Sequence, residues 1–158
     1  MKDELFNAIR QQDISEVSNI LKNSPALVSE KDTRGSTPLL LASYYGLYDI
    51  SEIILKYPQN IDAQDASGNT ALMGVCFKGL QNIAKLLLEN GANPNITNFN
   101  GATALIFAVT FGRKEIAKLL LENGADTTIK DDRGNTALTH AKLQGIKEMV
   151  ELLEKNSE

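Results

Sequence analysis

One spacing constrains the fold of this chain more than any other feature. Glycine recurs every 33 residues, at Gly35, Gly68, Gly101 and Gly134. A threonine follows each of these glycines two positions later, at Thr37, Thr70, Thr103 and Thr136. A fixed period of this size indicates stacked copies of one supersecondary unit. The sequence therefore predicts a repeat array, in which each unit contacts mainly its neighbours.

Each unit is predicted to contain two helices joined at a glycine. Thr37 suits an N-cap because its hydroxyl can accept a hydrogen bond from a free amide, and Pro38 suits the first helical position. Glycine adopts the left-handed conformation without a Cβ penalty, so we expect the first helix to end at a second glycine column. That column is Gly46, Gly79, Gly112 and Gly145. Beyond it, Ile83, Leu86 and Leu87 fall at i, i+3 and i+4, which places them on one face of a second helix.

A turn with the pattern D-x-x-G or N-x-x-G precedes each helix pair. The four turns span residues 32–35, 65–68, 98–101 and 131–134. An Asp or Asn side chain can bond its own backbone in such a turn, and the glycine supplies a positive φ. We therefore predict that these segments form the tips of short hairpins.

These features resemble the ankyrin repeat family, whose unit of 33 residues combines a β-turn with two antiparallel helices and carries the signature T-P-L-H-x-A. The resemblance covers almost the whole chain. It implies an all-α solenoid of stacked helix-turn-helix units with short β-hairpin-like turns, forming a single domain over residues 1–158. The expected units are an N-terminal cap repeat at 1–31, full repeats at 32–64, 65–97 and 98–130, and a C-terminal cap repeat at 131–158.

The chain departs from this signature at the histidine. Leu40, Met73, Ile106 and Thr139 stand at that position. We expect apolar burial between neighbouring units to replace the hydrogen bonds that the histidine usually provides.

Residue types that carry chemistry are sparse. His140, the only histidine, stands in a column that is otherwise apolar or glycine, and Cys76, the only cysteine, is predicted to be a small packing residue. No phosphate-binding glycine loop, zinc spacing or nucleophile–base pair is present. We therefore predict no catalytic residue, metal site or cofactor. One alternative stays open, in which the turn carboxylates of Asp62, Asp65, Asp131 and Asp132 bind a cation or act as acid and base, although the turns explain these residues without a site.

The charge balance opposes binding to nucleic acid. The formal net charge is −4 and the isoelectric point is near 5.1, whereas phosphate attraction requires a basic surface. No apolar stretch approaches the roughly 20 residues that span a bilayer, and Asp3 and Glu4 stand where a signal peptide would carry its apolar core. We expect a cytoplasmic protein without membrane association. Twelve lysines against four arginines are typical of an AT-rich bacterial genome.

Two columns escape the apolar pattern just before each glycine between the helices. They are Arg10, Tyr44, Phe77, Thr110 and Leu143, and Gln11, Tyr45, Lys78, Phe111 and Gln144. In ankyrin arrays these positions face a concave groove that the hairpin tips extend, and by this resemblance a partner protein binds there. The expected partner-binding residues are Tyr44, Tyr45, Phe77, Lys78, Thr110 and Phe111 on the helices, and Thr33, Arg34, Ser67, Asn69, Phe99, Asn100 and Arg133 at the tips.

Aromatic anchors surrounded by polar groups are the usual composition of a protein-binding hot spot. The predicted function is therefore a non-catalytic protein–protein interaction module, acting as a monomer. Two alternatives remain beside the enzyme or ligand site described above: the aromatic side chains pack on neighbouring hairpins and only stiffen the array, or the groove of one copy binds the end of another.

Overall fold

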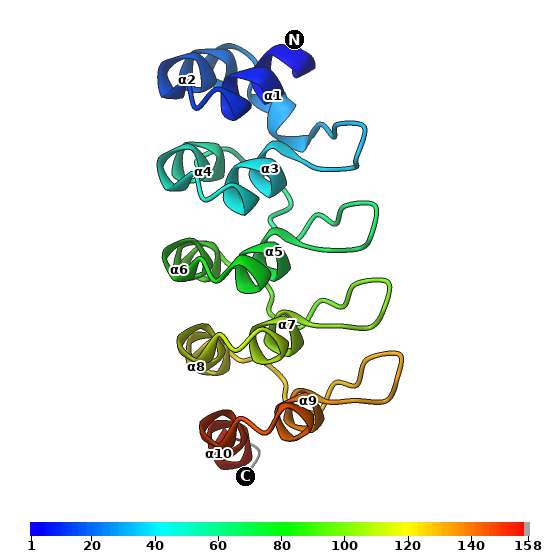
Figure 1. Ribbon diagram of the computed structural model, residues 1–158. Coiled ribbons are helices and arrows are strands. Elements are labelled where there is room, and N and C mark those ends of the chain that lie inside the picture. The colour runs from blue at the N-terminus through cyan, green and yellow to red at the C-terminus, as the bar shows by residue number, and fades with distance from the viewer. Residues whose placement is uncertain (157–158) are drawn as a thin grey trace.

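A computed structural model describes residues 1–156 of the chain, and in this range it contains α-helices and one short 3₁₀ helix but no β-strand (Figure 1). The helices form consecutive pairs. These are α1 (Lys2–Arg10) with α2 (Ile14–Asn23), α3 (Pro38–Tyr44) with α4 (Tyr48–Leu55), α5 (Ala71–Lys78) with α6 (Gln81–Glu89), α7 (Ala104–Thr110) with α8 (Lys114–Glu122), and α9 (Ala137–Gln144) with α10 (Lys147–Asn156). The 3₁₀ helix η1 (Pro25–Ser29) follows α2. The predicted all-α repeat solenoid is confirmed.

The pairs stack in chain order, so that the N-terminus and the C-terminus lie at opposite ends of the array (Figure 1). The first helices of the pairs form one layer and the second helices form another, while the hairpins project beyond the first layer (Figure 1). Successive first helices contact one another, as do successive second helices. The hairpins and the first helices therefore lie side by side along the whole array.

The first helices of the last four pairs begin at the predicted threonines, whereas α1 begins after Met1 without a side-chain cap. The Thr37 hydroxyl accepts a hydrogen bond from the Leu40 amide at 3.2 Å, and the other three threonines of the column cap α5, α7 and α9 in the same way. The helices end at the second glycine column, where Gly79, for example, has a φ of +78°. Threonine and glycine thus fix both ends of the first helix, as predicted.

The core is a continuous apolar layer between the helices of successive units. Leu40, Met73 and Ile106, which replace the signature histidine, are all buried. This confirms the prediction that apolar burial takes the place of the histidine's hydrogen bonds. At Thr139 the replacement is polar, and its hydroxyl lies 3.1 Å from that of Thr136.

The hairpins form a third column beside the two helix layers. In the first hairpin one Asp32 carboxylate oxygen accepts hydrogen bonds from the amides of Arg34 and Ser36, each at 2.9 Å. Asp65, Asn98 and Asp131 accept the same pair of bonds in their own hairpins. Because the side chain of the first residue closes the turn, the predicted hairpin tips are confirmed.

Candidate binding groove

The aromatic side chains at the ends of the first helices remain exposed. The exposed fractions are 40% for Tyr44, 55% for Tyr45, 37% for Phe77 and 43% for Phe111. These residues end α3, α5 and α7, which are neighbours in one layer, so they lie along the same side of the array. We call these helix ends, together with the hairpin tips, the groove face.

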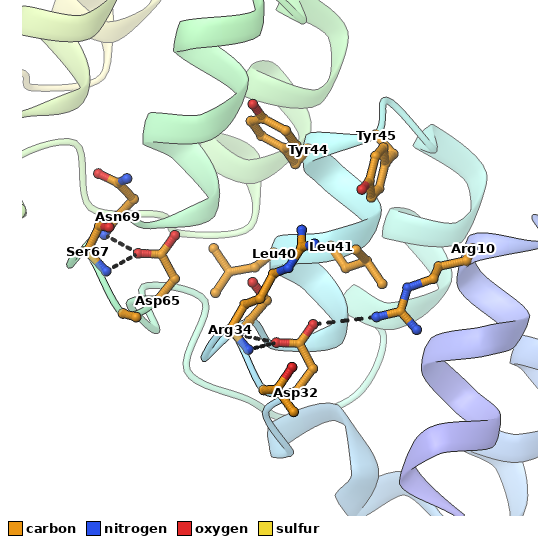
Figure 2. A pocket seen from close by; sticks show the side chains of 13 residues that line it. Arg10, Asp32, Arg34, Leu40, Leu41, Tyr44, Tyr45, Asp65, Ser67 and Asn69 are labelled. Carbon is orange, nitrogen blue, oxygen red and sulfur yellow. Dashed lines mark hydrogen bonds and ion pairs between the residues drawn. The ribbon is translucent and has the colours of Figure 1, made fainter.

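A hollow of about 680 Å³ lies at the N-terminal half of the groove face (Figure 2). We call it the N-terminal pocket. It is lined by Arg10, Asp32, Thr33, Arg34, Ser36, Leu40, Leu41, Tyr44, Tyr45, Asp65, Ala66, Ser67 and Asn69. The structure thus brings six of the predicted partner-binding residues into one pocket: Thr33, Arg34, Tyr44, Tyr45, Ser67 and Asn69.

Several lining residues of the N-terminal pocket were not among the predicted binding residues. Leu40 and Leu41 were assigned to the core, yet each keeps a small exposed edge in the pocket. Arg10 stands in the same sequence column as Tyr44, and this column was the signal that could have included it. Asp32 was assigned to its turn alone, and Asp65 to its turn or to the alternative carboxylate site.

Most charged groups of the N-terminal pocket already have partners. Arg10 donates to the Asn7 side-chain oxygen at 3.3 Å, and its guanidinium lies 3.7 Å from the second carboxylate oxygen of Asp32. In Asp65 the first carboxylate oxygen closes its turn with the amides of Ser67 and Asn69. The pocket is therefore a mixed surface of balanced charges and aromatic rings.

Beyond this pocket the aromatic side chains contact one another between repeats. The rings of Phe77 and Phe111 meet edge to face with centroids 4.7 Å apart, and Phe107 stacks on Phe111 at 6.4 Å. The ammonium of Lys78 lies 4.8 Å from the centre of the Tyr44 ring. These side chains pack on their neighbours and are also exposed, so packing and partner binding do not exclude each other here.

Side chains of the following repeat bind the last carbonyls of two first helices. Arg113 donates to the Phe77 carbonyl at 3.0 Å, and Gln144 donates to the Thr110 carbonyl at 2.7 Å. A Cβ at Gly79 would lie 2.9 Å from the Arg113 guanidinium, so the absence of a side chain at this position makes room for the contact. These bonds tie neighbouring repeats together directly beneath the exposed aromatic rings.

The remaining predicted residues lie on the hairpin tips of the later repeats. Phe99 donates its amide to the Ser67 carbonyl at 3.2 Å, and its ring covers Gly68, although 68% of the residue is exposed. The Asn100 carbonyl accepts the amide of Asp132 at 3.0 Å. Arg133 is exposed on the last tip. Backbone bonds between successive tips therefore fix their spacing.

Three of the four turn carboxylates of the alternative site, those of Asp62, Asp65 and Asp131, already accept hydrogen bonds from the scaffold. One Asp62 oxygen accepts the Asn93 amide at 2.9 Å. Asp131 closes its turn with one oxygen and binds His140 with the other at 2.7 Å, a contact that the sequence reasoning missed. Burial of the Asp131 carboxylate acts to raise its pKa, but the hydrogen bonds that it accepts outweigh this and lower the pKa. Within residues 1–156 no three His, Cys, Asp or Glu side chains gather in a way that could hold a metal ion.

Cys76 is fully buried, and this burial raises the pKa of its thiol. A protonated thiol without solvent access is a poor nucleophile. Its place in the structure agrees with the predicted packing role.

Comparison with protein families gives two matches. The family model for ankyrin repeats in three copies matches residues 5–98, and the model for ankyrin repeats in many copies matches residues 87–141. No individual curated protein matches the chain. None of the described helices has the length and apolar character needed to cross a membrane.

Proposed function

Since this chain belongs to the ankyrin repeat family, we propose that it is a non-catalytic module that binds another protein through the groove face. Ankyrin repeats are generally protein–protein interaction modules, and the family is typically non-catalytic. We also propose that the chain works as one monomeric domain in the cytoplasm of a bacterium and does not bind nucleic acid. Its acidic composition and its excess of lysine over arginine support this setting.

The observation that carries the proposal is the row of exposed aromatic side chains on one side of the array. Tyr44, Tyr45, Phe77 and Phe111 are exposed at the ends of three neighbouring first helices. Large aromatic groups in the centre of a polar surface are the residues that most often dominate binding energy. Four of them in one row provide anchors for an extended contact with a partner.

The construction of the groove face also favours binding. The bonds from Arg113 and Gln144 hold the helix ends, and backbone bonds hold Phe99 and Asp132 to the preceding tips. A surface that is already ordered loses little conformational entropy when a partner docks. We therefore expect the groove face to bind without rearrangement of its backbone.

Affinity capture from the native cell tests the proposal with two matched variants. Tyr45→Ala removes the most exposed aromatic residue at the helix ends of the groove face, at 55%. Tyr48→Ala removes a tyrosine exposed to 39% that lies with Asn82 and Lys85 of α6 on the second-helix layer. We expect Tyr45→Ala to lose the captured protein and Tyr48→Ala to retain it, both with the wild-type melting temperature. Retention by Tyr45→Ala, or equal loss from both variants, would refute binding through the groove face.

Light scattering on the purified chain checks the proposed monomer. A mass of two or more chains at the concentration used for capture would instead favour association of the groove face with a second copy.

A further inference from the structure

The four arginines of the chain differ in whether their guanidinium groups have partners. Arg113 binds the Phe77 carbonyl, and Arg10 binds Asn7 and Asp32. The side chains of Arg34 and Arg133 make no hydrogen bond or ion pair with any residue of the described range. Arg34 lines the N-terminal pocket, and Figure 2 shows its side chain extending from the hairpin toward the tyrosine pair. The pocket therefore contains one guanidinium that has no hydrogen-bond or ion-pair partner among the described residues.

The carboxylates of the same pocket have much less free bonding capacity. In Asp32 one oxygen accepts two amides and the other faces Arg10. In Asp65 one oxygen accepts two amides, which leaves a single oxygen open. A guanidinium, by contrast, has five N–H donors in a planar fork, and the Lys78 ammonium beside Tyr44 adds further donors. Among the charged side chains, the open N–H donors thus outnumber the one open carboxylate oxygen, and this favours an anion over a cation as the ligand next to Arg34.

The rest of the pocket is suited to an apolar group next to that anion. Leu40 and Leu41 present their edges in the pocket, below the rings of Tyr44 and Tyr45 in the view of Figure 2, and the centroids of these two rings are 6.0 Å apart. A guanidinium binds a carboxylate through two parallel hydrogen bonds, which fixes the orientation of the ligand as well as its charge. A peptide with a carboxylate beside an apolar side chain would fill both parts of the pocket.

We propose that the N-terminal pocket binds an acidic segment of the partner protein, with an Asp or Glu carboxylate on the Arg34 guanidinium and a neighbouring apolar side chain against Leu40, Leu41 and the tyrosine pair. This inference rests on the proposed function, because it specifies the chemistry of a segment that docks on the groove face. Since the whole chain carries a net charge of −4, long-range attraction does not supply the selectivity. The selectivity comes from the local contact with Arg34.

A phage-displayed library of random linear peptides, selected on the purified full chain, tests the inference without knowledge of the natural partner. We expect the selected peptides to be enriched in Asp or Glu beside an apolar residue. A selected peptide is then synthesised, and its affinity is measured by fluorescence anisotropy for wild type and two variants. Arg34→Gln is expected to weaken binding about tenfold, and replacing the peptide's acidic residue by its amide should have the same effect. Lys85→Gln, which removes an exposed cation of α6 on the second-helix layer, should leave the affinity unchanged.

The outcomes separate this inference from the proposed function. Basic or uncharged peptides that lose affinity with Tyr45→Ala but not with Arg34→Gln would overturn the acidic segment and leave binding through the groove face standing. Peptides that are insensitive to both variants, or a selection without any binder that depends on the groove face, would count against both. An equal loss with Lys85→Gln would show that the effect comes from the net charge of the chain and would overturn the local contact with Arg34 in the N-terminal pocket. Thermal melting of each variant confirms that it is folded.

Discussion

Replacement of Ser51 by alanine is predicted to stabilise the fold. This serine lies in α4, is fully buried, and its hydroxyl has no hydrogen-bond partner among residues 1–156. The equivalent positions in the next two repeats are Ala84 and Ala117, which are equally buried. A buried hydroxyl without a partner costs about 1–2 kcal/mol, and alanine is also the better helix former. We therefore expect Ser51→Ala to raise the free energy of unfolding by about 1–2 kcal/mol.

Urea denaturation followed by circular dichroism measures this change, because a shift of the midpoint at constant slope reports stability alone. In a thermal melt the same gain corresponds to an increase of about 2–8 °C for a chain of this size. Ser43 is the matched control, since it is also fully buried but donates to the Leu40 carbonyl at 3.4 Å. We expect Ser43→Ala to lose up to about 1 kcal/mol. If Ser51→Ala is destabilising, or if both variants change stability by the same amount, the reasoning from the missing partner is wrong.

Two further predictions concern the hairpins. Gly68→Ala places a Cβ at a φ of +82° and 2.7 Å from the Phe99 amide nitrogen, so we expect the free energy of unfolding measured with urea to fall by about 2–4 kcal/mol. Gly134→Ala is the control, since its φ is +80° but no atom lies near the new Cβ, and it should lower the free energy of unfolding by only about 1–2 kcal/mol. Equal losses would contradict the role of the Phe99 contact. The second concerns Asp131, whose lowered pKa contributes stability that is present above its unfolded-state value of about 4 and is lost as the pH falls through the folded-state value. Asp131→Asn keeps the turn, because Asn98 makes the same hydrogen bonds in its own hairpin. We expect this variant to show a smaller decrease in melting temperature than wild type when the pH is lowered from about 7 to about 2. An unchanged pH profile would show that Asp131 does not contribute.

The sequence predicted the features that recur in every unit. Thr37 and its three counterparts cap helices, and Asp32 and its counterparts close turns, because each of these roles needs only one residue type at one place in the local backbone. Four copies of the same pattern at one period make such a local signal unambiguous. The partner-binding role of the exposed residues, by contrast, stays a prediction.

The contacts that occur only once were not predicted. Arg113 occupies a column that is otherwise Leu47, Leu80 and Ile146, and this departure was the available signal for its bond to the Phe77 carbonyl. The bond joins residues of two repeats through a long side chain, so it depends on the distance between repeats and on a side-chain conformation. Similarly, the contact between His140 and Asp131 depends on how α9 packs against its hairpin. Periodicity specifies the average unit and gives no information about such exceptions.

In the proposed function, these exceptions would make the groove face of a repeat array selective. The repeated residues build nearly identical helix pairs, which by themselves would give every unit the same surface. Along the groove face the unrepeated residues differ: the N-terminal pocket combines Arg34 with Tyr44 and Tyr45, whereas the next segment presents the Phe77–Phe111 pair above a helix end held by Arg113. A partner that binds along this face therefore meets a charged and aromatic site first and an apolar site next, at a spacing fixed by the repeats. In the proposed binding mode, selectivity would therefore follow from the order of these sites, while the repeated scaffold that holds them stays the same.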